Sequence, residues 1–222
     1  MNPYYEDHDA GITIYNARCE DVLPSIDPED FAVLLTDPPY GIGYRSGFER
    51  TSLPCSIEGD EDTELRDGAL HWWGDRPALI FGTWRSARPA ATRARLIWDT
   101  KGALGMGDLS IPWKPSDQEI YVLGAGFVGR RTTNVVVHAP VQSLGRNGRV
   151  HPHEKPVGLM MMLLEKCPTG PVIDPFMGSG PIAQACHELG RRYIGIELVE
   201  DYCRIAVSRL AQQTLDLDAG TA

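Results

Sequence analysis

The tetrapeptide Asp37-Pro38-Pro39-Tyr40 combines residue types that could hold and orient a planar ring bearing an amino group. Two consecutive prolines restrict the backbone, so they stiffen the segment that carries the carboxylate and the aromatic ring. Asp37 and the Pro38 carbonyl could accept hydrogen bonds from the amino group while Tyr40 stacks on the ring. On the tetrapeptide alone, a rigid turn with an N-capping Asp37 remains the simpler interpretation.

A second candidate site is the glycine-rich segment DPFMGSG at 174–180, between a predicted strand and a predicted helix. Open α/β sheets bind ligands outside the carboxyl ends of their strands. Gly178 and Gly180 would let the backbone approach a ligand closely. Glu197 ends the next predicted strand, where an acidic side chain suits the hydroxyls of a ribose. This order of turn, helix, strand and acid favours a nucleoside-bearing cofactor over a tight turn beside a solvated glutamate.

Another glycine pattern, GAGFVG at 124–129, matches a dinucleotide fingerprint in its letters. A second strand, without an intervening helix, is predicted to follow it, and Arg149 stands near where a ribose-binding acid belongs. The fingerprint is specific only with its helix and its acid. We therefore expect a hairpin turn here.

The elements that must position these segments alternate between strand and helix. Continuous apolar runs such as 31–36 and 77–83 are typical of strands buried on both faces of a parallel sheet. We predict strands over 11–16, 31–36, 77–83, 94–100, 171–174 and 191–198, and helices over 61–73, 156–167, 181–190 and 200–213. Segments 119–124 and 133–138 are expected to form an antiparallel pair at the sheet edge, and the tail after Leu215 to fray. The pattern predicts a doubly wound α/β sheet, mostly parallel with an antiparallel edge hairpin.

The charge is unevenly distributed along the 222 residues, whose formal net charge is −9. Residues 1–70 hold 16 acidic and 4 basic residues, whereas residues 71–155 hold 6 acidic and 12 basic ones. The basic middle segment could face nucleic-acid phosphates, or its arginines could simply solvate helix and loop faces. The sequence leaves both interpretations open.

Several classes of protein are excluded by composition. A hydrophobic content of 42% and a charged content of 23% are those of a globular domain. The five cysteines are widely spaced without a CxxC pair, which suits reduced thiols and argues against a disulfide framework or a zinc site. No apolar run approaches the roughly 20 residues of a membrane span, and residues 1–12 are acidic, unlike a signal peptide. We expect a cytoplasmic protein.

Taken together, DPPY at 37–40, HEKP at 153–156 and DPFMGSG at 174–180, followed by RRYIGIEL, resemble the S-adenosylmethionine-dependent amino-DNA methyltransferases. The DPPY element precedes the glycine turn, as in the permuted β-group order of N6-adenine and N4-cytosine methylases. The resemblance implies a Rossmann-like methyltransferase sheet, S-adenosyl-L-methionine as cofactor, DNA as partner and no metal. It is compatible with a homodimer. An initial Asp is more usual for adenine than for cytosine, and RNA- or protein-modifying members more often begin with Asn.

The resemblance also assigns roles to individual residues. Asp37, Pro38, Pro39 and Tyr40 would form the catalytic set that holds a flipped-out base. The cofactor would contact Thr36, Lys155, Asp174, Phe176, Gly178, Ser179, Gly180 and Glu197, with Lys155 neutralising its carboxylate. One departure concerns residues 17–19, which are Ala-Arg-Cys where the family often has Gly-Asp-Cys. Arg18 therefore stands where an acid would contact the adenine of the cofactor.

We expect residues 1–222 to form a single methyltransferase domain. Its catalytic half would span 11–100 and its cofactor-binding half 151–215, with loops over 101–150 that could hold a reduced target-recognition region. Only 41–64, 101–114 and 139–150 are left for reading DNA, which predicts a short or relaxed recognition sequence. The alternatives are an N4-cytosine methyltransferase and a binding module that has lost catalysis. A restriction partner would be a separate chain.

Overall fold

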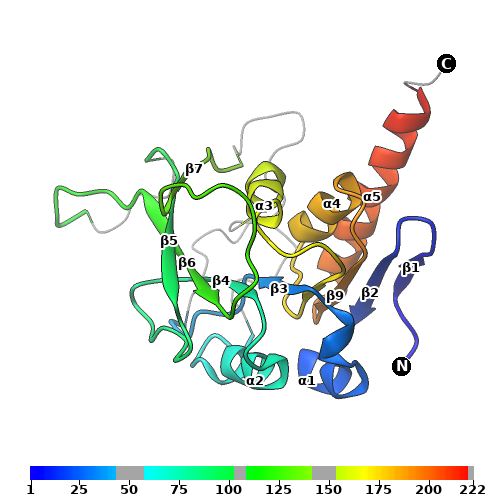
Figure 1. Cartoon of the computed structure of the whole chain (residues 1–222), viewed down its shortest axis with the longest axis horizontal. Coiled ribbons are helices and arrows are strands. Elements are labelled where there is room, and N and C mark those ends of the chain that lie inside the picture. Colours follow the sequence, from blue (N-terminus) through cyan, green and yellow to red (C-terminus); the bar gives the residue numbers. More distant parts are fainter. Residues whose placement is uncertain (44–57, 103–108, 142–153, 220–222) are drawn as a thin grey trace.

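The computed structural model describes residues 1–43, 58–102, 109–141 and 154–219, which form one mixed sheet with helices on both faces (Figure 1). The strands are β1 (Tyr5–Asp7), β2 (Ile12–Asn16), β3 (Val33–Thr36), β4 (Ala78–Gly82), β5 (Ala94–Asp99), β6 (Asp117–Leu123), β7 (Val135–Val137), β8 (Val172–Asp174) and β9 (Tyr193–Glu197). The helices are α1 (Cys19–Val22), α2 (Glu64–Trp73), α3 (Val157–Leu164), α4 (Pro181–Glu188) and α5 (Glu200–Ala219), with 3-10 turns at Leu23–Ser25 and Pro28–Asp30.

The sheet order is β1-β2-β9-β8-β3-β4-β6-β5-β7. Its central strands β2, β9, β8, β3 and β4 are mutually parallel, so their carboxyl ends share one edge. From β8 the chain continues through α4 to β9 on one side, whereas from β3 it continues through α2 to β4 on the other. The carboxyl ends of β8 and β3 therefore lie at the point where the winding reverses, which is the ligand-binding position of such sheets.

An antiparallel region lies at the predicted edge of the sheet, but its pairing differs from our expectation. Strand β6 pairs antiparallel with both β4 and β5, whereas β7 pairs parallel with β5 and not with β6. The turn at Gly124–Gly129 consequently belongs to no hairpin. Gly124 has a positive φ of 67°, and a Cβ there would lie 2.2 Å from the Arg76 carbonyl oxygen. As predicted, strand β7 follows this turn without an intervening helix.

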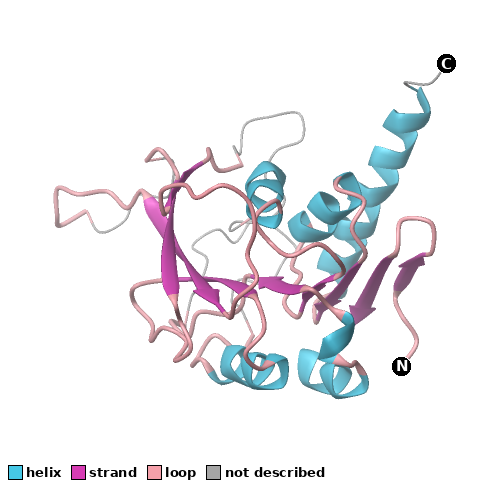
Figure 2. Cartoon of the chain, viewed as in Figure 1, coloured by secondary structure: helices cyan, strands magenta, loops and turns pink. Residues whose placement is uncertain are grey.

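Two buried clusters cover the two faces of the sheet. Successive residues of β4 point alternately to each, because side chains alternate across a strand: Leu79 and Phe81 join the cluster with α3, α4 and α5, and Ala78 and Ile80 join the one with α2. Figure 2 shows α3, α4 and α5 on one side of the sheet and α1 and α2 on the other. Every residue of β3 and β4 is buried, which confirms the prediction of strands covered on both faces.

The remaining differences concern element ends. Strand β1, which pairs antiparallel with β2, was not predicted. Helix α5 continues to Ala219, beyond the expected fraying point at Leu215. Among the helices of the described ranges, none is long and apolar enough to cross a membrane.

Candidate active site

The two candidate segments meet at the switch point through a buried hydrogen bond. Thr36, the last residue of β3, donates its hydroxyl to Oδ1 of Asp174, the last residue of β8, at 2.6 Å. Because β3 and β8 are parallel neighbours, this bond fixes the start of the 37–40 turn against the start of the glycine turn. Thr36 is 2% exposed, so its hydroxyl is engaged between the strands.

Asp174 is fully buried and surrounded by donors. Besides Thr36, its carboxylate accepts from the Tyr193 hydroxyl at 3.1 Å and from the Phe176 backbone N–H at 3.1 Å. Burial nevertheless dominates and raises the pKa of this carboxyl from 3.8 to about 7, although the three donors oppose the shift. Asp174 therefore holds the base of the glycine turn together from inside the protein.

Asp37 and Tyr40 contact each other directly across the proline turn. The Tyr40 hydroxyl donates to Oδ1 of Asp37 at 2.5 Å. Burial, reinforced by the neighbouring Asp37 carboxylate, raises the pKa of the Tyr40 phenol well above its ordinary value of 10, so the phenol stays protonated and remains a donor. Beyond the turn, the buried Asp60 accepts from the Gly41 N–H at 2.8 Å, which anchors its far end.

Lys155 lies beside the proline turn, on Asp37 itself. Its ammonium forms an ion pair with Oδ2 of Asp37 and donates to the Tyr40 hydroxyl at 3.3 Å. The same nitrogen lies 5.0 Å from the centre of the Phe81 ring and 5.8 Å from that of Tyr40. The resemblance implied a cofactor contact for Lys155; in the structure, its 4% exposed side chain contacts Asp37.

The glycine turn has space beside it on the sheet edge. Gly178 has a positive φ of 56°, and a Cβ there would meet nothing within 4 Å. Its N–H donates to Oε2 of Glu197 at 2.8 Å, while Oε1 accepts from the Val199 N–H at 2.7 Å. Partial burial raises the pKa of Glu197. The half-buried carboxylate is thus oriented by two backbone donors next to the open position at Gly178.

Other residues of the glycine turn face the protein. Gly180 approaches α5 so closely that a Cβ would lie 2.6 Å from that of Ala206, at a positive φ of 81°. The carbonyl and hydroxyl oxygens of Ser179 accept from Arg209 at 3.1 and 3.3 Å. Phe176 is half-buried against the second core cluster. Gly180 and Ser179 thus shape the turn through packing against α5.

Sequence reasoning missed two residues that support the site. Tyr193 donates a hydrogen bond to Asp174, and Arg209 donates to Ser179. One available signal was the glycine inside the YIGIE strand, since a strand glycine often indicates a close approach. A Cβ at Gly195 would lie 2.6 Å from the Tyr193 hydroxyl and 2.8 Å from the Met177 sulfur. No comparable local signal points from Arg209 to a turn 30 residues earlier in the chain.

Arg18, which stands where the family often has an acid, contacts two acidic side chains. Its guanidinium donates to Glu58 at 2.9 Å and lies 3.8 Å from Glu20. Both contacts raise its pKa, that with Glu58 most. No group of three or more metal-ligating side chains occurs among the residues that the structure describes, and the histidines of HPHE at 151–154 lie outside them.

The basic middle segment does not form one surface in the described part of the chain. Arg88 and Arg95 pair with the buried Glu119, and Arg93 donates to the Gly124 carbonyl. Arg130 lies at the opposite edge of the sheet from the candidate site, where its carbonyl accepts from Lys166 at 2.7 Å. Arg146, Arg149 and most of the loops expected to read DNA lie outside the described residues.

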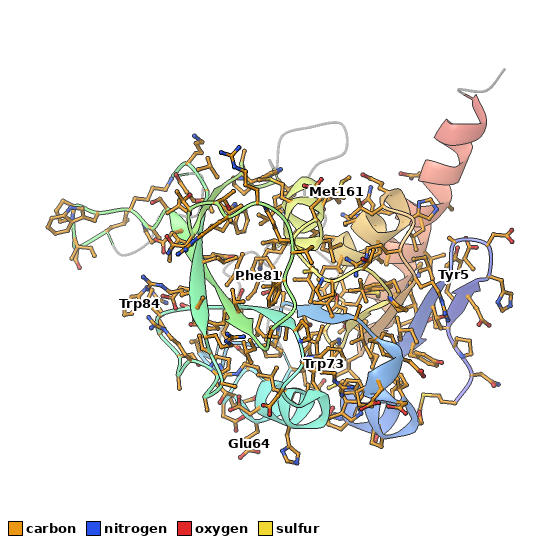
Figure 3. All side chains as sticks on the ribbon, viewed as in Figure 1. Tyr5, Glu64, Trp73, Phe81, Trp84 and Met161 are labelled. Atoms are coloured by element: carbon orange, nitrogen blue, oxygen red, sulfur yellow. The ribbon has the colours of Figure 1, made fainter. Side chains whose placement is uncertain are left out.

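Two exposed tryptophans follow strands that end at the site edge. Trp84, two residues beyond β4, is 75% exposed, and the Arg85 guanidinium lies 5.7 Å from its ring centre. Trp113, in the connection after β5, is 76% exposed. Figure 3 shows Trp84 at the periphery of the molecule and Phe81 in its interior. This edge therefore offers aromatic and cationic groups to a partner.

Comparisons with known proteins agree with this arrangement. A family model described as DNA methylase matches residues 129–208. YubD of Escherichia coli (strain K12), which is named as a methylase, is 30% identical over 92% of this chain and 92% of its own length. The type II methyltransferase M.ScaI of Streptomyces caespitosus is 24% identical over 97% of this chain and 86% of its own length.

Two solved structures share the fold. The cytosine-N4-specific PvuII DNA methyltransferase superposes with a TM-score of 0.68, covering 93% of this chain and 88% of its own at 15% identity. The M1.HpyAVI complex with S-adenosylmethionine superposes with a TM-score of 0.62, covering 89% and 99% at 20% identity. The mixed sheet described above is therefore one that solved methyltransferases also have.

Proposed function

This chain belongs to the N6/N4 family of DNA methylases, which depend on S-adenosylmethionine, and from that premise we propose that it methylates the exocyclic N6 of a flipped-out adenine in DNA. The observation that carries the proposal is the Thr36–Asp174 bond, which joins the proline turn to the glycine turn at 2.6 Å. A group held by Asp37 and Tyr40 would thereby lie next to one held by Gly178 and Glu197.

The residues of the glycine turn fit the nucleoside part of the cofactor. The space beside Gly178 is open, and because glycine has no side chain, a ligand could occupy it. Each Glu197 oxygen uses one lone pair on a backbone N–H and keeps another for a ribose hydroxyl. We propose that Phe176 and the backbone around Ser179 and Gly180 complete this site. When bound, the cofactor supplies an electrophilic methyl group on its sulfonium.

The proline turn supplies orientation for the reaction. An aromatic amine is a weak nucleophile because its lone pair is delocalised into the ring. Asp37 and the Pro38 carbonyl would accept its two hydrogens, favouring a tetrahedral nitrogen whose lone pair points at the methyl group, while Pro39 keeps the turn rigid. Tyr40 would stack on the base. The amine would take the methyl group in an in-line displacement as the sulfur–methyl bond breaks, and it would then pass one proton to Asp37 and on to water. Catalysis is then mainly positioning.

The choice of adenine rests on Asp37 at the first position of the tetrapeptide, the residue more usual in adenine-specific members. The N4-cytosine neighbour shares the fold at 15% identity, which leaves the base open. The test is to incubate the protein with labelled S-adenosylmethionine and unmethylated duplex DNA and to identify modified nucleosides by mass spectrometry. N6-methyladenine is the expected product. N4-methylcytosine would overturn the choice of base, and label in neither base would favour a binding module without catalysis.

We also propose how DNA and a second copy relate to this domain. The duplex would lie across the sheet edge that carries Asp37, Trp84 and Trp113, with 101–150 as a reduced recognition region and short or relaxed specificity. Sequencing of methylated DNA tests this, since a long stringent site would contradict it. A homodimer remains a proposal that sedimentation velocity can test.

A further inference from the structure

Lys155 is a buried cation whose described partners belong to the proline turn. A buried ammonium must be paired, because its desolvation is costly without a counter-charge. With its side chain 4% exposed, Lys155 contacts one oxygen of Asp37 and, at 3.3 Å, the hydroxyl of Tyr40, which itself donates to the other oxygen at 2.5 Å. Each carboxylate oxygen of Asp37 is therefore held by one protein donor.

The segment that carries Lys155 is fixed to the opposite half of the site. Glu154, 8% exposed, accepts from Arg209 at 2.7 Å, and Arg209 also donates to Ser179 in the glycine turn. Adjacent residues thus reach in two directions, Glu154 toward the glycine turn and Lys155 toward Asp37. Pro156 follows with φ −68° as the residue that caps the N-terminus of α3, which limits the freedom of the segment.

From this arrangement we propose that Lys155 is a positioning residue for Asp37 rather than the partner of the cofactor's carboxylate. It orients the carboxylate so that the remaining lone pairs face the amino group of the base. The Arg209–Glu154 ion pair holds Lys155 in place relative to the glycine turn. The inference deepens the proposed function, because it concerns the same transfer reaction.

The proposal is tested with Lys155→Met and Lys155→Arg in the full chain. Methionine keeps an unbranched side chain only one atom shorter and packs well against the Phe81 and Tyr40 rings, but it removes the charge. Two measurements are made. The first is kcat at saturating S-adenosylmethionine, with unmethylated duplex DNA of mixed sequence as substrate. The second is the affinity for S-adenosylhomocysteine and for 5′-methylthioadenosine. The second compound lacks the amino-acid group. Lys166→Met, which alters a lysine just beyond the C-terminal end of α3, is the matched control.

We expect Lys155→Met to lower kcat about tenfold to 100-fold, with both affinities within twofold of the wild type. Lys155→Arg should recover part of the activity, and the control should match the wild type. A selective loss of affinity for S-adenosylhomocysteine with unchanged kcat would overturn the proposal and return Lys155 to the cofactor. Unchanged kcat and affinities would overturn it too.

Two features keep the outcome interpretable. The assay counts label in both bases, so it does not depend on adenine being the target, and a wild-type protein without turnover would contradict the proposed function instead. If Lys155→Met does not fold by thermal melting, Glu154→Gln takes its place, since it weakens the anchor and leaves Lys155 present. Lower kcat with unchanged affinities is expected there as well, and an unchanged kcat would overturn the proposal.

Discussion

The Thr36 hydroxyl donates to the Asp174 carboxylate at 2.6 Å and ties together the last residues of two parallel strands. One strand continues into the proline turn and the other into the glycine turn, so the bond sets the separation between the two proposed half-sites. Because both side chains are buried, solvent does not compete for the bond. The geometry of the site therefore depends on a contact made inside the sheet.

The first prediction concerns the pH dependence of stability through Asp174. Its pKa is about 7 in the folded protein against an ordinary value of 3.8, so the folded state retains a proton that the unfolded chain releases. The free energy of unfolding should therefore fall as pH rises from about 4 to about 7, by on the order of 2–4 kcal/mol from this group. Asp174→Asn should remove this component, which urea unfolding at pH 5 and pH 8 measures.

The amide suits the site, since its oxygen can accept from Thr36 and Phe176 and its nitrogen can donate to Tyr193. Glu200→Gln, at the exposed start of α5, is the control for loss of an acidic group. Contributions to stability that Asp174→Asn does not alter cancel in the difference between wild type and variant. An equal difference at both pH values would contradict a raised pKa for Asp174.

Much of this arrangement is predictable from local sequence. The apolar run at 31–36 and the order of strand, turn, helix and acid around 174–197 predict two parallel strands whose carboxyl ends carry the site. Local sequence does not predict which residue is the hydrogen-bond or ion-pair partner of each buried polar group. Lys155 and Asp37 are separated by 118 positions, and no spacing rule joins them. The same holds for Thr36, whose bond to Asp174 follows only from the register of β3 and β8.

The edge of the sheet was harder to predict for a different reason. Strand β7 has only three residues, and VVV suits any strand position. Strands that follow one another along the chain usually pair, so β6 is expected to pair with β7. In the structure, β6 already has β4 and β5 on its two sides. With both edges of β6 occupied, β7 pairs instead with the free edge of β5.

The second prediction concerns Tyr40. Tyr40→Ala removes the ring that would stack on the base together with the hydroxyl that bonds Asp37 and Lys155, whereas Tyr40→Phe removes only the hydroxyl and these two bonds. Base stacking on an aromatic side chain is worth about 1–3 kcal/mol, so Tyr40→Ala should lower kcat/KM for DNA about tenfold to 100-fold. Tyr40→Phe should lose less, and both should bind S-adenosylhomocysteine as the wild type does.

Tyr4→Ala, which alters an exposed tyrosine near the N-terminus, serves as the control. Methyl transfer to DNA and cofactor titration together give the result. If Tyr40→Ala retained wild-type turnover, Tyr40 would have no part in holding the base. If it instead lost cofactor affinity alone, the tyrosine would belong to the glycine-turn half of the site.

The third prediction concerns Glu197. Glu197→Gln leaves a single oxygen for the Gly178 and Val199 N–H groups, and it removes the charge that would bond the ribose hydroxyls. Hydrogen bonds to charged groups are worth about 1.5–3 kcal/mol, so affinity for S-adenosylhomocysteine should fall about tenfold to 100-fold. Calorimetric titration measures it, with Glu200→Gln as the matched control. An unchanged affinity would mean that the ribose lies elsewhere.

The last prediction concerns the DNA-facing edge. Arg85 and Trp84 follow β4 at the carboxyl edge of the sheet, whereas Arg130 lies at the opposite edge. Arg85→Ala should weaken DNA binding and reduce the slope of log affinity against log salt by about one, since each phosphate contact releases roughly one counterion. Trp84→Ala should weaken binding with little change in that slope. Arg130→Ala should leave both quantities unchanged. Fluorescence anisotropy across a salt series measures them, and an equal loss from Arg85→Ala and Arg130→Ala would contradict a duplex bound at the carboxyl edge.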